Sequence, residues 1–137
     1  VEISVVYTGT LGCAATHGPS GQQLTTDAPV DNGGRGSAFS PTDLVATALG
    51  ACMLTIMGLM AERRGLDLRG TQVHVIKEMV AAPVRRIGRL VVRITLPPDR
   101  PIDADDRTRL ERAALLCPVK QSLHPDVAIP IEWVWPA

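Results

Sequence analysis

A long stretch without charge constrains the fold of this chain more than any other feature. No charged residue lies between Asp43 and Glu62, and most of the side chains in between are apolar. A helix that is apolar on every side is normally buried on every side. Cys52 lies in the middle of this stretch, so the first question is whether its thiol serves packing or chemistry.

The residues that flank the stretch carry the start and stop signals of a helix. Ser40 is a favoured N-cap residue, and Pro41 suits the first helical position, where a missing N–H has no consequence. Asp43 follows three residues after Ser40, as in a shortened capping box. Gly65 can adopt the left-handed conformation that ends many helices. The sequence therefore predicts a helix from Ser40 to Gly65.

A transmembrane span is the alternative interpretation of the same run, because residues 44–61 are long enough and uncharged. The strand-forming flanks, and the glycines and threonines inside the run, favour a helix buried in soluble protein, for example between two subunits. We therefore expect no membrane partner.

Composition narrows the possible functions further. The chain has 137 residues, a formal net charge of zero and only four aromatic residues. This length predicts a single domain over residues 1–137. The neutral charge and the scarcity of aromatic rings argue against a nucleic-acid partner. Three widely spaced cysteines do not indicate a disulfide scaffold, and no signal peptide is visible, so we expect a reducing cytoplasm.

Hydropathy patterns predict an α+β fold. Alternating apolar residues indicate strands, and apolar residues at helical spacing indicate a second long helix. The order is three strands, a helix, two strands, one or two helices and a strand, which favours antiparallel sheets over a doubly wound parallel sheet. The predicted strands are residues 1–8, 11–17, 22–27, 72–81, 87–96 and 128–135; the predicted helices are 40–65 and 103–116, with a helical turn near 119–123.

Two cysteines are candidates for chemistry, and each has a structural alternative. Taken alone, Cys52 is better explained as a small apolar residue that packs inside the helix, and reactivity would need a nearby group that stabilises its thiolate. Cys117 precedes Pro118, so it is either an ordinary residue at a helix end or the N-cap of a new helical turn. In the second case, unpaired N–H groups would favour its thiolate. Cys13 has no predicted role.

Arg35 and Asp43 are the charged candidates. Arg35 lies in a glycine-rich loop before the helix, where its guanidinium either is solvated or lowers the pKa of a thiol. Asp43 is explained by capping alone, with a second possible role of holding an arginine in place. The three histidines are scattered, and without converging ligands we expect no metal site.

Two cysteine motifs carry a family resemblance. The segments Phe39-Ser40-Pro41-Thr42-Asp43-Leu44, Leu49-Gly50-Ala51-Cys52-Met53 and Cys117-Pro118-Val119 together resemble the OsmC/Ohr family. The predicted order of strands and helices also fits that family over almost the whole chain. The resemblance implies an OsmC-like fold in which a long buried central helix lies between antiparallel sheets. It also implies an intertwined homodimer with active sites at the subunit interface.

The resemblance implies a thiol-dependent peroxidase that acts on small organic hydroperoxides. Cys52 matches the peroxidatic cysteine and Cys117 the resolving cysteine. Arg35 is the candidate for the activating arginine, and Asp43 stands near the position of the glutamate that holds this arginine in the family. No bound cofactor is implied; an external dithiol reductant restores the thiols. The alternatives from other classes are a non-enzymatic protein that binds apolar ligands and a redox sensor without turnover.

Overall fold

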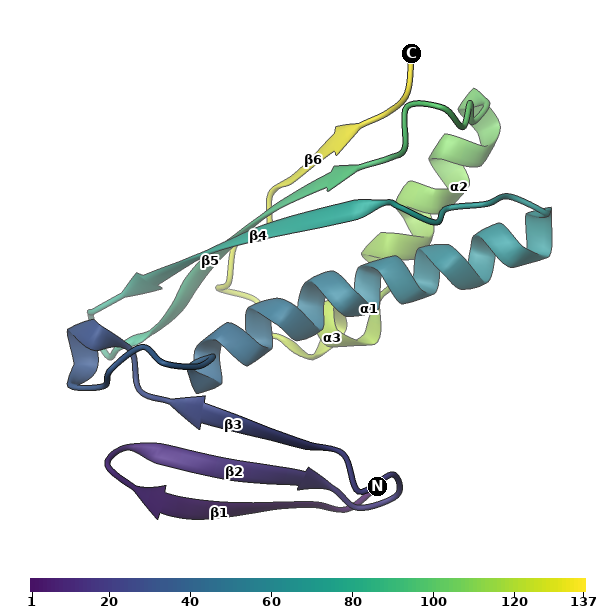
Figure 1. Cartoon of the computed structure of the whole chain (residues 1–137). Coiled ribbons are helices and arrows are strands. Elements are labelled where there is room, and N and C mark those ends of the chain that lie inside the picture. The colour runs from purple at the N-terminus through teal and green to yellow at the C-terminus, as the bar shows by residue number, and fades with distance from the viewer. The chain divides into compact units, whose positions relative to one another are not determined.

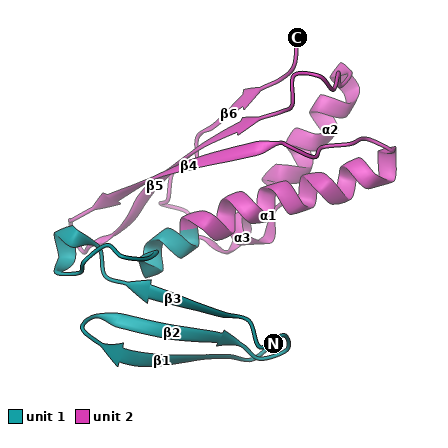
Figure 2. Ribbon diagram, viewed as in Figure 1, with its two compact units in different colours: residues 1–45 teal, residues 46–137 magenta.

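The chain divides into two compact units. A computed structural model describes residues 1–137, with one unit formed by Val1–Val45 and the other by Ala46–Ala137 (Figure 2). The boundary falls inside the long helix α1 (Pro41–Arg64), whose first turn belongs to the first unit. The single domain expected from chain length stays a prediction.

The first unit is a three-stranded antiparallel sheet in the order β1-β2-β3. Its strands are β1 (Ile3–Gly9), β2 (Gly12–His17) and β3 (Gln23–Asp27) (Figure 1). All three match the predicted strands to within two residues. The loop that follows contains one turn of 3-10 helix, η1 (Val30–Asn32), and leads into α1.

One face of this small sheet is apolar and exposed. The strand register places Val5 opposite Ala15, and Ala15 opposite Leu24, so these side chains share a face. Val5 is 62% exposed, and Ile3 and Tyr7, on the same face of β1, are exposed to a similar extent. An apolar sheet face of this kind is normally covered by another surface.

The second unit contains a mixed three-stranded sheet covered on one face by helices (Figure 1). Its strands are β4 (Gln72–Val80), β5 (Arg86–Thr95) and β6 (Ile131–Val134), and besides α1 its helices are α2 (Ala104–Leu115) and α3 (Pro118–Ser122).

The pairing of β5 with β6 corrects the prediction of wholly antiparallel sheets. β4 pairs antiparallel to β5, as expected for a hairpin, but β5 and β6 are parallel. The chain leaves β5, passes through α2 and α3, and re-enters the sheet in the same direction. A long helical crossover is the connection that parallel neighbours require.

The core of the second unit lies between its sheet and its helices. Leu90, Val92 and Ile94 of β5 are fully buried, whereas Arg89 and Arg93, whose side chains point to the other face, are exposed. The buried β5 residues form one cluster with residues of α1 and α2, among them Leu49, Met53, Met57, Leu110 and Ala114.

An ion pair between exposed Arg64 and buried Asp106 links α1 to α2. The guanidinium Nε of Arg64, in the last turn of α1, donates to the carboxylate Oδ1 of Asp106 at 2.8 Å. Asp106 is 6% exposed and lies in the first turn of α2. Because α2 leads directly to Cys117, this pair helps to place the second cysteine against α1.

The expectation that α1 is buried on every side is wrong for the single chain. Met53 and Met57 face the core and are fully buried, but Ala51, Thr55 and Leu59 are exposed, with Leu59 47% exposed. These exposed residues recur at helical spacing and form a second, nearly apolar stripe. By length and composition alone, α1 would also be able to cross a membrane, a test that core helices of soluble proteins pass as well.

Candidate active site

Cys117 is fully buried at the start of α3. It is the N-cap of that helix, and its sulfur accepts a hydrogen bond from the backbone N–H of Lys120 at 3.3 Å. Pro118 occupies the first turn, where its missing N–H leaves nothing unpaired. The N-cap position predicted for Cys117 is therefore confirmed.

The structure brings Cys52 and Cys117 close together. Cys52 lies on α1, is half-buried and packs against the core cluster that contains Cys117. The two side chains lie close enough for Cys52 to raise the pKa of Cys117, although they are 65 residues apart in sequence. Both cysteines are free, and so is Cys13. The pair therefore satisfies the first requirement of disulfide chemistry, which is close approach of the two sulfurs.

The surroundings keep Cys117 protonated. Burial raises the pKa of the Cys117 thiol above its ordinary value, the Lys120 N–H opposes this rise, and the adjacent Cys52 side chain raises the pKa further. At neutral pH Cys117 is thus protonated, and the expectation that its N-cap position favours the thiolate is wrong, because burial outweighs the Lys120 N–H.

The backbone of α1 approaches β4 closely at Gly50. Gly50 lies one half-turn before Cys52 on α1 and faces β4. A Cβ atom at Gly50 would lie 3.0 Å from Val73 Cγ1 and 3.3 Å from Val75 Cγ2. Because glycine has no Cβ, α1 can pack closely on β4 at this point.

Arg35 lies in the first unit, in the glycine-rich loop before α1, and its side chain is exposed. Its backbone N–H donates to Asp27 Oδ2 at 3.3 Å, and Ser37 donates to the same oxygen. A pocket of about 230 Å³ is lined by Arg35 together with Cys13 and Asp27. The candidate arginine therefore belongs to the first unit, and the two candidate thiols belong to the second.

Asp43 caps α1. Its Oδ2 accepts the backbone N–H of Ser40 at 2.8 Å, and its own N–H donates to Ser40 Oγ at 3.1 Å. This reciprocal pair is the capping box that the sequence indicates, with aspartate in place of glutamate. A role in holding an arginine stays a prediction.

Asp27 and Ser37 are functional candidates that the sequence did not single out. The available signal was modest: short polar side chains beside a glycine-rich loop often bond to nearby backbone N–H groups. Asp27 closes β3, and its partners lie eight and ten residues later in the loop.

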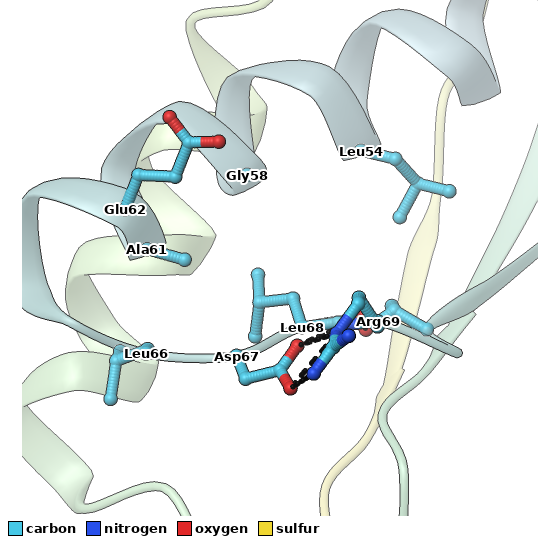
Figure 3. Close-up of a pocket in the computed structure, with 9 residues that line it drawn as sticks. Leu54, Gly58, Ala61, Glu62, Leu66, Asp67, Leu68 and Arg69 are labelled. Carbon is cyan, nitrogen blue, oxygen red and sulfur yellow. Dashed lines mark hydrogen bonds and ion pairs between the residues drawn. The ribbon is translucent and has the colours of Figure 1, made fainter.

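A larger cleft of about 520 Å³ lies in the second unit, between the C-terminal half of α1 and the connection to β4 (Figure 3). Leu54, Gly58 and Leu68 give it an apolar side. Asp67 and Arg69 form an ion pair at its edge, with Arg69 Nη2 at 2.7 Å from Asp67 Oδ2 (Figure 3). Neither cysteine of the thiol pair lines this cleft. No three His, Cys, Asp or Glu side chains converge as metal ligands would.

Comparison with known proteins decides the family. The model of the OsmC-like protein family matches residues 34–132, which include Arg35, α1 and both cysteines of the pair. This chain belongs to the OsmC-like protein family. A search of curated proteins finds no match.

Solved structures of OsmC-like proteins agree with this assignment. A protein from Psychrobacter arcticus, provisionally named as an osmotic stress-induced and detoxification response protein, is 42% identical, with a TM-score of 0.89 over 96% of this chain and 93% of that chain. An organic hydroperoxide resistance protein OsmC from Legionella pneumophila is 15% identical, with a TM-score of 0.76 over 97% and 95% of the two chains.

A third solved structure comes from Vibrio cholerae and is provisionally named an organic hydroperoxide resistance protein. It is 14% identical, with a TM-score of 0.72 over 97% of this chain and 91% of that chain, and it holds captopril in one of its active sites. At such identities the likeness of the Legionella and Vibrio proteins to this OsmC-like protein is one of fold.

Proposed function

We propose that this OsmC-like protein is a thiol-dependent peroxidase that reduces small organic hydroperoxides. The observation that carries the proposal is the proximity of the Cys52 and Cys117 side chains in the core of the second unit. Packing alone does not require two cysteines from distant segments to meet, whereas a two-cysteine peroxidase does. The distant relatives named for hydroperoxide resistance share this fold and so support the same activity.

The proposed reaction begins at Cys52. Its thiolate attacks one oxygen of the hydroperoxide, the O–O bond breaks, and the second oxygen leaves as an alcohol after taking up a proton. Cys52 is then a sulfenic acid. The Cys117 sulfur attacks the Cys52 sulfur, a disulfide forms and water leaves. An external dithiol reduces this disulfide by exchange, is itself oxidised to a disulfide and restores both thiols.

The remaining candidates have supporting roles. We propose that Arg35 is the activating arginine implied by the family resemblance, since a fixed positive charge brought near a thiol favours its ionised form. Asp43 serves as the acidic partner at the start of α1. We further propose that the active form is a homodimer and works in the cytoplasm, where a reducing environment regenerates free thiols.

Steady-state peroxidase assays test the proposal. The reduced protein is mixed with cumene hydroperoxide, tert-butyl hydroperoxide or hydrogen peroxide, with dithiothreitol as the dithiol. We expect faster consumption of the two organic peroxides. Cys52→Ser should lower the rate about a hundredfold or more, since it removes the nucleophile. Cys13→Ser is the matched control and should keep the rate of the unmodified protein. Equal rates for Cys52→Ser and the unmodified protein would reject the peroxidase.

The cleft of the second unit favours one second candidate, a protein that binds an apolar ligand without turnover. Its volume of about 520 Å³ falls in the range of small-molecule sites, and Leu54 and Leu68 line it. Cys52→Ser discriminates the two functions. If an apolar fluorescent probe binds equally well to this variant, and the unmodified protein consumes no peroxide, the binding function is the correct one.

A further inference from the structure

The arginine loop is attached to the sheet of the first unit by one carboxylate. Asp27 is 3% exposed, and its Oδ2 accepts three hydrogen bonds, from Arg35 N at 3.3 Å, Ser37 N at 3.1 Å and Ser37 Oγ at 2.8 Å. The backbone N–H of Asp27 donates to Phe39 O at 3.2 Å. Asp27 thus contacts the loop on both sides of Gly36 and again just before α1.

The loop has little room to adopt another conformation while these bonds hold. Gly34 N donates to Pro29 O at 3.0 Å, and Gly36 N donates to Ala28 O at 3.4 Å. A Cβ atom at Gly34 would overlap Ala28 O, so only glycine fits the close approach of the two loop segments. Backbone hydrogen bonds thus hold the loop segments together, and the Asp27 side chain attaches the loop to the end of β3.

The charge of Asp27 depends on the closed loop. Hydrogen bonds from Ser37, and in smaller part from Arg35 N, hold the pKa of this carboxyl below its ordinary value, against the effect of burial. Among the residues that line the surrounding pocket, Arg35 is the other charged one. Oδ1 is buried without a hydrogen-bond partner, so the carboxylate depends on the loop contacts at Oδ2.

We propose that Asp27 is a positioning residue that fixes the Arg35 loop and so determines where the guanidinium is presented for peroxide reduction. The role rests on the function proposed above and deepens it, because it adds a residue outside the thiol pair and the arginine. Asp27 acts through Arg35 and has no contact with the reacting atoms in this scheme.

The first test measures the loop itself and needs no activity. Amide ¹H–¹⁵N spectra of the full-length protein are recorded as the pH is lowered. We expect the amide signals of Arg35 and Ser37 to shift together, with a midpoint below 3.8, the ordinary pKa of aspartate. The loop is closed above this midpoint and opens as the pH falls through it, because the folded-state pKa is depressed. If the amide signals of Arg35 and Ser37 shifted with different midpoints, Asp27 would not hold the loop closed and the inference would be wrong.

The second test is a double-mutant cycle in hydroperoxide reduction, with Asp27→Asn, Arg35→Ala and the combined variant. The asparagine keeps the shape but replaces a carboxylate by a neutral amide, which weakens hydrogen bonds to the loop. We expect each single variant to slow the oxidation of Cys52 about tenfold, and the combined variant to be no slower than Arg35→Ala. Asp99→Asn, which removes a carboxylate from an exposed turn, is the control and should keep the rate.

The cycle separates failure of this inference from failure of the proposed function. If Arg35→Ala is slow but Asp27→Asn keeps the rate, or if the two effects multiply, Asp27 is not acting through Arg35 and the inference is wrong. If Arg35→Ala keeps the rate of the unmodified protein, Arg35 is not the activating arginine. The inference about Asp27 is then wrong as well. Melting temperatures of all variants identify any rate loss that comes from unfolding.

Discussion

Gly50 illustrates how one missing side chain permits close packing. It faces Val73 and Val75 of β4 so closely that an added Cβ would lie 3.0 Å from Val73 Cγ1. The sequence placed Gly50 inside a predicted helix, where glycine is unfavourable by about 1 kcal/mol relative to alanine. The close packing against β4 explains why glycine occupies this helical position.

Gly50→Ala is therefore predicted to destabilise the protein, although alanine is the better helix former. The added Cβ would lie 3.0 Å from Val73 Cγ1, and overpacking of this kind costs about 1–3 kcal/mol. We expect a net loss of about 1 kcal/mol in the free energy of unfolding, measured by urea denaturation.

Gly58→Ala, on the same helix, is the matched control for this substitution. Nothing lies within 4 Å of a Cβ atom at Gly58. Its replacement should raise the free energy of unfolding by about 0.5–1 kcal/mol through helix propensity alone. Equal stabilisation by both alanines would show that α1 does not pack closely on β4 at Gly50.

Residue-level prediction from the sequence succeeded where the signal was local. Cys117 was identified as a possible N-cap because Pro118 follows it, and both residues act within one helical turn. Asp27 was missed because its partners, Arg35 and Ser37, lie across a glycine-rich loop. The path of such a loop depends on several backbone contacts, none of which has a sequence signature.

At the scale of elements, helix ends were easier to predict than strand directions. The predicted helix from Ser40 to Gly65 agrees with α1 (Pro41–Arg64) because its caps are encoded next to it. The parallel pairing of β5 with β6 was not predicted, since alternation of apolar residues shows which face of a strand is buried but not its direction in the sheet. That direction depends on the crossover through α2.

The N-cap of α2 offers a test at this scale. Asp103 accepts the backbone N–H of Asp106 through Oδ1 at 2.8 Å. Asp103→Ala should lower the free energy of unfolding by about 1 kcal/mol, because it leaves a helix-end N–H without this acceptor. Asp103→Asn keeps a capping oxygen and should retain most of the stability. If urea denaturation gives the same stability for the alanine and asparagine variants, the cap does not stabilise α2.

At the scale of the whole molecule, the chain leaves apolar surface uncovered in both units. In the first unit it is the face of the β1–β3 sheet that carries Ile3 and Val5; in the second it is the stripe of α1 that carries Leu59. The sequence predicted complete burial of α1, and a single chain does not provide it. A second copy of the chain would cover such surfaces, which supports the proposed homodimer.

Light scattering of the purified protein tests the dimer. We expect a molar mass twice the 14.6 kDa of one chain. Leu59→Glu should weaken the dimer about tenfold or more, because it places a charge in an apolar interface. Val84→Glu, at a side chain that is 63% exposed in the β4–β5 turn, is the control and should leave the mass unchanged. A single-chain mass for the unmodified protein at micromolar concentration would contradict the dimer.

The central claim is that peroxide oxidises Cys52 and that Cys117 then forms a disulfide with it. The most direct measurement adds one equivalent of an organic hydroperoxide to the fully reduced protein and maps the cysteines by peptide mass spectrometry. The proximity of the two side chains predicts a disulfide between Cys52 and Cys117 within one chain, with Cys13 still reduced. Peroxide left unconsumed, with Cys52 and Cys117 both still reduced, would contradict the account.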